Sequence, residues 1–576
     1  MTDWLGECDV SRLGNFVWSI ADQLRGVYKP HQYGSVILPF TILRRLDCIL
    51  APTRDEVRDL AKRHEGGALD VQVRRKLDLR FYNTSEFDFA KLLADPEDLR
   101  SNLIDYISRF SANIDVFERF RFENELATLD EKGRLYLVVS KFAEVDLHPR
   151  RVPNAEMGDL FEELIRKFAE ASNEEAGEHY TPRDAIRLMV DLLFAEDSPA
   201  LMEPGVVRTI YDPTAGTGGM LSVAEERLAD RKSPARLVLF GQEINDQSYA
   251  ICKSDMLAKG QDATNIQLGD TLVDDKFAGR TFDYCMSNPP YGVDWKAAQA
   301  SVKAEAAAIP NGRFGHGLPP VSDGQMLFLT HLAHKMRPKH EGGGRAGIVL
   351  NGSPLFNGGA GSGPSEIRRW LLESDLVDAI VALPTNMFFN TGIATYIWIL
   401  DNDKAPERKG KVQLIDATSF WSKLRKNLGA KGREIDDSGR ERIVKLYDDF
   451  AETEHSKIFN TDEFGYWTIT VERPLVDDDG KAIADAKGRL KPDSKRRDTE
   501  NVPFTYFGGI DAYFKAEVLP HVPDAWIDEK KTKVGYEIPF TRLFYRYVPP
   551  RPLAEIDADL EAQVTRILSL LREIDE

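Results

Sequence analysis

The feature that most constrains this chain is an apolar run, Phe282 to Met286, followed directly by Ser-Asn-Pro-Pro-Tyr at 287–291. The run predicts a buried strand, and the two prolines predict its end, because proline cannot donate a hydrogen bond to a sheet. Asn288 should then lie at the carboxyl end of a strand, where open α/β sheets bind ligands. The Asn288 side chain and the Pro289 carbonyl offer two fixed acceptors, and Tyr291 offers a flat face. This set suits an amino group on a planar base, although the same residues could form a plain strand-to-loop turn.

A second motif lies upstream, where the apolar residues 206–211 predict a short strand. Asp212 follows at once, and then a glycine-rich turn over 213–219 and a helix. Such a unit lets the backbone approach a nucleoside-type ligand closely. It is not a P-loop, because no Gly-Lys-Ser/Thr follows, and Leu221 stands where a dinucleotide fingerprint has its third glycine. Asp212 is a poor neighbour for a pyrophosphate and a good acceptor for an ammonium group.

The next two predicted strands also lead into acidic residues. Residues 237–241 are followed by Glu243, and residues 265–268 are followed by Asp270. An acid at the end of the second strand is placed to accept hydrogen bonds from both ribose hydroxyls, and Asp270 could accept from an adenine amino group. Either acid alone is more often a solvated loop residue. Together, at the tips of consecutive strands, they favour ligand contacts.

A helix is expected just before the glycine-rich turn. Thr181 is typical of an N-cap and Pro182 of a first helical position, and Ile186 to Leu193 continue with helical spacing. The N–H groups at the start of this helix would suit a carboxylate. His179, just before it, is more often a packing residue than a ligand.

After Tyr291 comes a long segment, 293–322, with little strand character, which is typical of functional or mobile segments. Phe388 and Phe389 lie between two later predicted strands, where they would either plug the core or wall a base. The later strands are expected at Ala346–Leu350, Leu376–Leu383 and Thr395–Leu400.

Composition limits the possible partners. The 576 residues need more than one core, and they carry a net charge of −18. A protein that holds DNA alone usually has a basic excess, so either one face is locally basic or a partner supplies most of the contact. The absence of a signal pattern and of any apolar run near about 18 residues predicts a cytoplasmic protein. The four cysteines form no CxxC pair, which argues against a zinc site and a disulfide framework.

The two ends of the chain read as helical. Residues 1–155 predict a helical domain, and residues 551–575 predict a last, coiled-coil-like helix. The polar stretch 481–501 predicts a flexible excursion between them. The apolar residues of the last helix step by 3, 4, 4, 3, 4 and 3, a spacing that favours packing against a partner helix: Leu553, Ile556, Leu560, Val564, Ile567, Leu571 and Ile574.

The order of these motifs resembles the S-adenosylmethionine-dependent amino-methyltransferases of DNA. The motifs are Thr-Pro, then Asp-Pro-Thr-Ala-Gly-Thr-Gly-Gly, then Glu243, Asp270 and Asn-Pro-Pro-Tyr. The helical first domain, Gly177 to Arg183, residues 389–395 and the tail from Trp526 to Tyr547 are similar to the modification subunit of type I restriction-modification systems. The resemblance covers most of the chain.

The resemblance implies an α/β fold. Its centre would be a doubly wound, Rossmann-like methyltransferase sheet of seven mostly parallel strands, with helices on both faces and one antiparallel strand near its edge. The N-terminal all-helical domain would span 1–155 and the methyltransferase domain 156–425. A C-terminal helical extension would span 426–576.

The resemblance also implies the site residues. S-adenosyl-L-methionine would be the cofactor, and no metal is implied. Glu243 would hold its ribose, and Ile244 and Asp270 its adenine. The catalytic residues would be Asn288, Pro289, Pro290 and Tyr291, and a flipped-out adenine would stack on Tyr291 and on Phe388 or Phe389. The methionine part would be held by Glu178, His179, Tyr180, Thr181, Pro182, Arg183, Asp212, Thr214, Ala215, Gly216, Thr217, Gly218 and Gly219.

The implied partners are DNA, a specificity subunit that reads the sequence and a second copy of this chain in the same complex. A restriction subunit is left open, and no membrane is expected. Two alternatives remain from the residues. A stand-alone methyltransferase acting on RNA or on a protein glutamine could use the same motif, and a non-catalytic scaffold could retain the fold. The helical first domain and the last helix argue against the former, and the complete motif set argues against the latter.

Overall fold

The computed structural model describes residues 19–29, 32–153, 156–157, 164, 181–258, 261–309, 311–389, 391–428, 430–477, 481–485, 487–545, 547 and 552–575. By its internal contacts the chain divides into two units, residues 1–538 and residues 539–576. Within the described ranges, no helix is both long enough and apolar enough to cross a bilayer.

The N-terminal part of the first unit is helical, as the sequence predicted. Phe40 packs edge-on against Phe122, with 4.8 Å between ring centroids, and stacks on Phe142 at 5.3 Å. Aromatic contacts of this kind hold most of these helices around one core, while Val57 and Leu60 form a second, small core with Leu69 and Val73. The helices are α2 (Tyr33–Leu50), α3 (Arg54–Ala61), α4 (Gly66–Leu77), α5 (Phe89–Ala94), α6 (Leu99–Ser108), α7 (Val116–Arg119), α8 (Phe122–Glu131) and α9 (Leu135–Ala143).

An ion pair ties these helices to the α/β part of the unit. Nζ of Lys253, in α14 (Asp246–Ala258), lies 2.7 Å from a carboxylate oxygen of Asp115, and the Tyr249 hydroxyl donates to Asp115 at 3.2 Å. α14 also packs on α7 and α2. The helical part is therefore docked on the sheet through α14.

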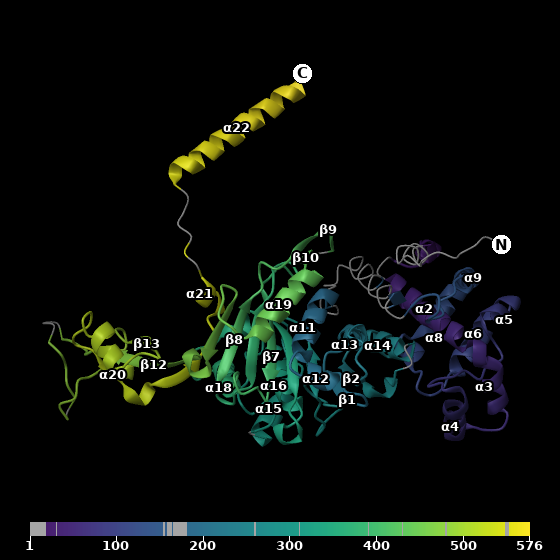
Figure 1. The fold of residues 1–576 in the computed structure, drawn as a ribbon, viewed down its shortest axis with the longest axis horizontal. Coiled ribbons are helices and arrows are strands. Elements are labelled where there is room, and N and C mark those ends of the chain that lie inside the picture. Colours follow the sequence, from purple (N-terminus) through teal and green to yellow (C-terminus); the bar gives the residue numbers. More distant parts are fainter. Residues whose placement is uncertain are drawn as a thin grey trace. The chain divides into compact units, whose positions relative to one another are not determined.

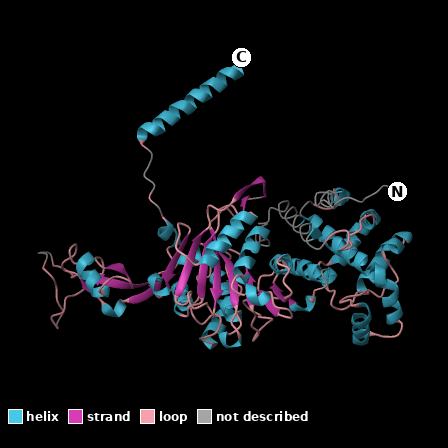
Figure 2. Cartoon of the chain, in the orientation of Figure 1, coloured by secondary structure: helices cyan, strands magenta, loops and turns pink. Residues whose placement is uncertain are grey.

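A large sheet forms the centre of the unit (Figures 1 and 2). Its strand order is β11-β8-β6-β7-β5-β4-β1-β2-β3. The strands are mainly runs of apolar residues, as expected for a parallel sheet that is covered on both faces. They are β1 (Val207–Asp212), β2 (Arg236–Glu243), β3 (Ile266–Leu268), β4 (Tyr284–Ser287), β5 (Arg345–Asn351), β6 (Val377–Ala382), β7 (Thr395–Asp401), β8 (Lys411–Asp416) and β11 (Ser456–Asn460).

The expected strand count of seven was too low, because β8 and β11 extend the sheet beyond β6. β7 runs antiparallel between β5 and β6, and β11 runs antiparallel to β8. Within the expected seven strands β7 is next to the edge, but the two added strands move it inward. β11 also carries the sheet past residue 425, where we expected the methyltransferase domain to end.

Helices cover both faces of the sheet (Figure 2). Ile210 of β1 lies in the same core cluster as the apolar residues of α11 and α13, while its neighbour Tyr211 contacts His331 of α16. Successive strand residues point to opposite faces, so the two helix layers lie on opposite sides. The helices are α11 (Arg183–Phe194), α12 (Ser198–Leu201), α13 (Gly219–Asp230), α15 (Gln299–Ala308), α16 (Gln325–Lys335), α17 (Ser353–Phe356), α18 (Gly363–Glu373) and α19 (Asp437–Asp449).

The segment 293–322 is more ordered than its sequence suggested. It contains α15, and its buried residues Trp295, Val302 and Phe314 form a small core of their own together with Leu327 of α16. This core holds the segment beside the carboxyl ends of β1–β4, where it can line a site.

The C-terminal extension is not all helical, in contrast to the prediction. β12 (Gly465–Glu472) is the centre of a small antiparallel sheet with β13 (Asp498–Pro503), β14 (Trp526–Ile527) and β15 (Lys533–Tyr536), and α20 (Gly509–Tyr513) lies beside it. β12 combines aromatic and β-branched residues, which favour strands. The end of the expected 481–501 excursion is therefore a strand. A hairpin of β9 (Ser422–Leu428) and β10 (Lys431–Glu434) precedes α19.

The second unit contains the short helix α21 (Phe540–Phe544) and the expected last helix, α22 (Leu553–Asp575). Between Leu553 and Ile567 the apolar stripe of α22 is exposed, from 38% at Ile556 to 74% at Leu553. A solvated helix would not be expected to carry such a stripe.

Candidate active site

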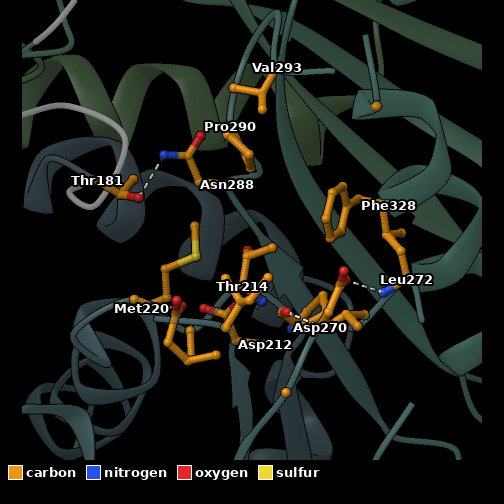
Figure 3. Close-up of a pocket in the computed structure, with 18 of the residues that line it drawn as sticks. Thr181, Asp212, Thr214, Met220, Asp270, Leu272, Asn288, Pro290, Val293 and Phe328 are labelled. Atoms are coloured by element: carbon orange, nitrogen blue, oxygen red, sulfur yellow. Dashed lines mark hydrogen bonds between the residues drawn. The ribbon is translucent and has the colours of Figure 1, made fainter. Parts of the chain in front are cut away.

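A cavity of about 340 Å³ lies where β1, β2, β3 and β4 end. Its lining confirms the position expected from the motifs, at the carboxyl ends of the first strands. Figure 3 shows Asn288 and Thr181 on one side of it and Asp270, Leu272 and Phe328 on the other. The expected residues that line it are Thr181, Asp212, Thr214, Ala215, Gly216, Thr217, Gly219, Glu243, Ile244, Asp270, Asn288 and Pro290.

Other expected site residues lie outside this lining. Arg183 forms an ion pair with Glu226 of α13, with 2.5 Å between the atoms, so its guanidinium holds two helices together. Glu178, His179 and Tyr180 lie outside the described residues. The described residues that do not line the cavity are Pro182, Arg183, Gly218, Pro289, Tyr291, Phe388 and Phe389.

Asp212, the last residue of β1, is fully buried. Its Oδ1 accepts from the backbone N–H and the hydroxyl of Thr214, at 2.9 and 3.2 Å. Its Oδ2 is buried without a hydrogen-bond partner among the described atoms, and burial raises the pKa of the carboxyl to about 7. An unpaired buried carboxylate oxygen is costly, so this atom is a ready acceptor for a cationic ligand group.

The glycine-rich turn holds the start of α13 close to the neighbouring helix. Gly218 has a φ of +83°, and a side chain there would place its Cβ 2.8 Å from Sγ of Cys252 in α14. Only glycine fits both the backbone angle and the space. Thr214 also lies 2.8 Å from the Ser287 hydroxyl, oxygen to oxygen, so the tips of β1 and β4 are linked by a hydrogen bond.

The two acids of the next strands are held by backbone N–H groups. The Glu243 carboxylate accepts from Gly216 at 2.7 Å and from Asn245 at 2.8 Å, one bond on each oxygen. Asp270 accepts from the Leu272 N–H at 2.9 Å. Each carboxylate is fixed in place, and each oxygen retains lone pairs that a ligand hydroxyl or amino group can use.

Both polar atoms of the Asn288 amide have a hydrogen-bond partner within the protein. Its Nδ2 donates to the Thr181 hydroxyl at 2.8 Å, and its Oδ1 accepts from the Tyr291 hydroxyl at 2.5 Å. Thr181 was expected to cap α11, but Pro182 occupies the N-cap position, and no side chain of the described residues makes a capping hydrogen bond there. Tyr291 was expected to offer its ring to a base, but here its hydroxyl occupies the acceptor of Asn288.

The two phenylalanines of the 387–389 loop are buried. Phe388 is 2% exposed and Phe389 is 8% exposed. The Phe388 ring lies edge-on to Tyr291, with 6.3 Å between centroids. The sequence allowed these two residues to be either a plug of the core or a wall for a base, and their burial favours the core plug.

Sequence reasoning missed one wall of the cavity. Trp295 and the neighbouring residues of the 293–298 segment line it, together with Phe328 of α16. Figure 3 shows the Phe328 ring beside Leu272 and Asp270. The only signal was the length of the 293–322 segment, because nothing local indicates which aromatic residues will face a cavity.

The comparisons with known proteins agree with this geometry. The chain shares 26% identity over 459 residues with the type I restriction enzyme MjaIX methylase subunit of Methanocaldococcus jannaschii, a match that covers 76% of each chain. It shares 25% identity over 378 residues with the EcoKI methylase subunit of Escherichia coli, covering 62% of this chain and 65% of that one.

A solved structure supports the fold. The methyltransferase subunit of the type I restriction-modification system from Streptococcus thermophilus superposes with a TM-score of 0.62 at 24% identity, over 79% of this chain and 97% of that one. Residues 13–142 match the model of the HsdM N-terminal domain. Residues 154–467, more than half of the 576, match the family model of N-6 DNA methylases. The chain thus belongs to the N-6 DNA methylase family.

Proposed function

We infer that this chain is the modification subunit of a type I restriction-modification enzyme. It transfers a methyl group from S-adenosylmethionine to the N6 amino group of an adenine that is flipped out of double-stranded DNA. The observation that carries this inference is the cavity that Asn288 shares with Asp212, Glu243 and Asp270. The family and the related methylase subunits support DNA as the substrate over RNA or a protein glutamine.

The lining fits the proposed cofactor. S-adenosylmethionine supplies an electrophilic methyl group. The unpaired Oδ2 of Asp212 would accept from its ammonium group, and the Glu243 carboxylate from its ribose hydroxyls. Asp270 would accept from the adenine amino group, beside Phe328 and Ile244. The carboxyl-rich cavity suits this ligand and would repel a pyrophosphate.

Asn288 orients the target amine. Its Oδ1 and the Pro289 carbonyl accept the two N–H bonds, so the nitrogen lone pair faces the methyl group, and positioning carries the catalysis. No base is needed before transfer, because the methylated ammonium product loses its proton readily to water. Tyr291 must first release Oδ1 of Asn288. Its ring is then free to stack on the flipped base, which would return about 1–3 kcal/mol of the few kcal/mol that flipping costs.

The test is Asn288→Ala, with the exposed Asn124→Ala as control. Loss of one positioned acceptor should raise the barrier to methyl transfer by about 2–4 kcal/mol. Calorimetry should find cofactor affinity nearly unchanged, because Asp212 and Glu243 remain. Methyl transfer to DNA by Asn288→Ala at the wild-type rate would refute the mechanism.

The proposed assembly contains a specificity subunit and a second copy of this chain, and a restriction subunit can join it. The net charge of −18 supports a partner that contributes to holding DNA. The exposed apolar stripe of α22 is suited to a partner helix. We propose that the complex works in the cytoplasm, where its DNA substrate lies.

A further inference from the structure

The β9–β10 hairpin is a basic element of an acidic chain, and the cavity does not use it. Residues 421–434 contain five Lys or Arg and one acid, against a net charge of −18 for the whole chain. Figure 1 shows β9 and β10 extending beyond the large sheet, beside α19 and α11. A concentration of positive charge at one place on an acidic protein points to an anionic partner.

One of these cations has a structural role. Lys431 is buried, and its Nζ lies 2.9 and 3.0 Å from the two carboxylate oxygens of Asp184 and 3.0 Å from the Met387 carbonyl. It fixes the turn end of the hairpin, where Lys431 pairs with Leu428, to α11 and to the loop after β6. Its charge is neutralised, so it offers nothing to a partner.

Three other cations have no carboxylate partner within the described part of the chain: Lys423, Arg425 and Arg433. Lys423 and Arg433 lie directly opposite each other in the antiparallel ladder. Like charges in this position destabilise a strand pair unless an anion lies between them. Arg425 lies two residues beyond Lys423 and so shares its face. The Arg433 guanidinium also stacks over Trp421, 3.9 Å from the ring centroid.

The hairpin is anchored on the Asn288 side of the cavity. The N–H groups of Ala430 and Gly432 donate to the Phe389 and Asn386 carbonyls at 2.8 and 3.0 Å, and Asn386 returns a bond to Ala430 at 3.2 Å. Asn386 and Phe389 lie in the loop after β6, and this loop also carries Phe388, whose ring contacts Tyr291. The basic face is therefore connected by short contacts to the residues that receive the target base.

We propose that the face formed by Trp421, Lys423, Arg425 and Arg433 binds the phosphate backbone of duplex DNA next to the flipped adenine. The proposal rests on the proposed function. Lys423 and Arg425 are spaced by about 7 Å along β9, which equals two phosphate spacings of about 3.4 Å measured along the DNA helix axis. A protein partner would more often bury apolar residues, and this face offers one half-exposed indole among three cations.

The test compares Lys423→Gln/Arg425→Gln with a matched control, Lys339→Gln/Lys409→Gln. The control lysines are also exposed, but they precede β5 and β8 and lie at the amino ends of strands, away from the cavity. Each variant is purified with the specificity subunit and titrated with a 30-bp duplex over a range of salt concentrations. Methyl transfer is measured on genomic DNA from a host that lacks the modification.

The hairpin variant should bind the duplex about tenfold more weakly at low salt, and the slope of log affinity against log salt should fall by about 2, one for each lost phosphate contact. Its KM for DNA should rise while kcat and cofactor affinity stay near wild type. The control should match the wild type. Unchanged affinity and salt slope in the hairpin variant overturn the proposal, and so does loss of the specificity subunit, which would assign the face to that partner. An inactive wild-type complex would instead count against the proposed function.

Discussion

Asp212 is a buried carboxyl group with one oxygen that is unpaired among the described atoms, and its proposed contact with the cofactor predicts that cofactor binding depends on pH. Burial raises its pKa to about 7, from 3.8 for an ordinary aspartate. The ammonium group needs the carboxylate form, so the affinity for S-adenosylmethionine should rise as pH increases through about 7. Below that pH, binding should release a proton, which calorimetry detects as a dependence of the binding enthalpy on the buffer.

The raised pKa of Asp212 also makes the stability of the fold depend on pH. The folded protein holds the Asp212 proton up to about pH 7 and the unfolded chain only to about 3.8, so the contribution of this group to stability falls as pH rises between them. Asp212→Asn should flatten the pH dependence of cofactor affinity and weaken binding at pH 8 by about 1.5–3 kcal/mol. An unchanged pH profile in this variant would assign the dependence to another group.

Thr181 should act on the reaction through Asn288. Its hydroxyl accepts from Asn288 Nδ2, which leaves Oδ1 as the atom that can face the target amine. Thr181→Val should cost about 1 kcal/mol of catalysis, seen as a several-fold lower kcat with an unchanged KM for S-adenosylmethionine. Thr181→Ser should restore kcat. A raised KM for the cofactor with normal kcat would support the cofactor contact that the family resemblance implied.

For individual residues, the sequence predicted where a side chain lies in the fold better than which group it forms a hydrogen bond with. Asp212, Glu243, Asp270 and Asn288 follow apolar runs, and parallel strands bring such residues to one edge. The partner of Thr181 was not predictable, because Asn288 lies 107 residues further along the chain. The orientation of Tyr291 was not predictable either, because its ring packs against Phe388 from a distant loop.

Some strands of the large sheet were predicted from the sequence and others were not. Long apolar runs such as β5 and β6 were found because their residues are buried on both faces. β8 and the edge strand β11 were missed because polar residues interrupt their apolar runs, although β8 is as long as β6. The β9–β10 hairpin was also missed, since Lys423 and Arg425 occupy alternating positions of β9 where a half-buried strand would usually carry apolar residues.

Substitution of Arg345, at the start of β5, tests how the ends of the strands are held together. Its Nε lies 3.1 Å from Asp401, and its guanidinium also approaches Asp378 at 3.7 Å and donates to the Leu193 carbonyl at 2.9 Å. Burial raises the pKa of Asp401 to about 6, so this carboxylate depends on the cation. Arg345→Leu should lower the free energy of unfolding by about 3–5 kcal/mol in urea, because it leaves buried charge uncompensated.

The control is Arg369→Gln on α18, whose guanidinium is 39% exposed and pairs with Glu373 at 3.0 Å. It should change stability by less than about 1 kcal/mol. If both substitutions have the same small effect, the network around Arg345 is solvated in solution and does not hold the strand ends together.

At the scale of the whole molecule, charge and exposed surface are divided between parts. A net charge of −18 opposes DNA binding, and the basic hairpin offsets it only locally. The sequence predicted that a partner is needed to bind DNA. It did not predict where a basic patch lies on the surface, because that depends on how distant segments fold together.

Helix α22 is the part of the chain best suited to recruit that partner. Leu553, Leu560, Val564 and Ile567 are 53–74% exposed, on a helix about 34 Å long. Deleting residues 552–576 should leave the fold of residues 1–538 and cofactor affinity unchanged, since the deleted part lies in the second unit. It should abolish co-purification with the specificity subunit, and with it the methylation of DNA.

A double substitution distinguishes the contribution of the apolar stripe from that of the helix as a whole. Leu560→Asp/Val564→Asp should lose the partner as the deletion does, because each introduced charge would have to be buried against the partner helix. Glu561→Ala/Gln563→Ala alters the same turns without touching the stripe, and should retain the partner. If the deletion still co-purifies with the specificity subunit in full stoichiometry, α22 is not the docking helix. The helical part at 33–143 then becomes the better candidate, because its position on α14 leaves its outer helices available to a second subunit.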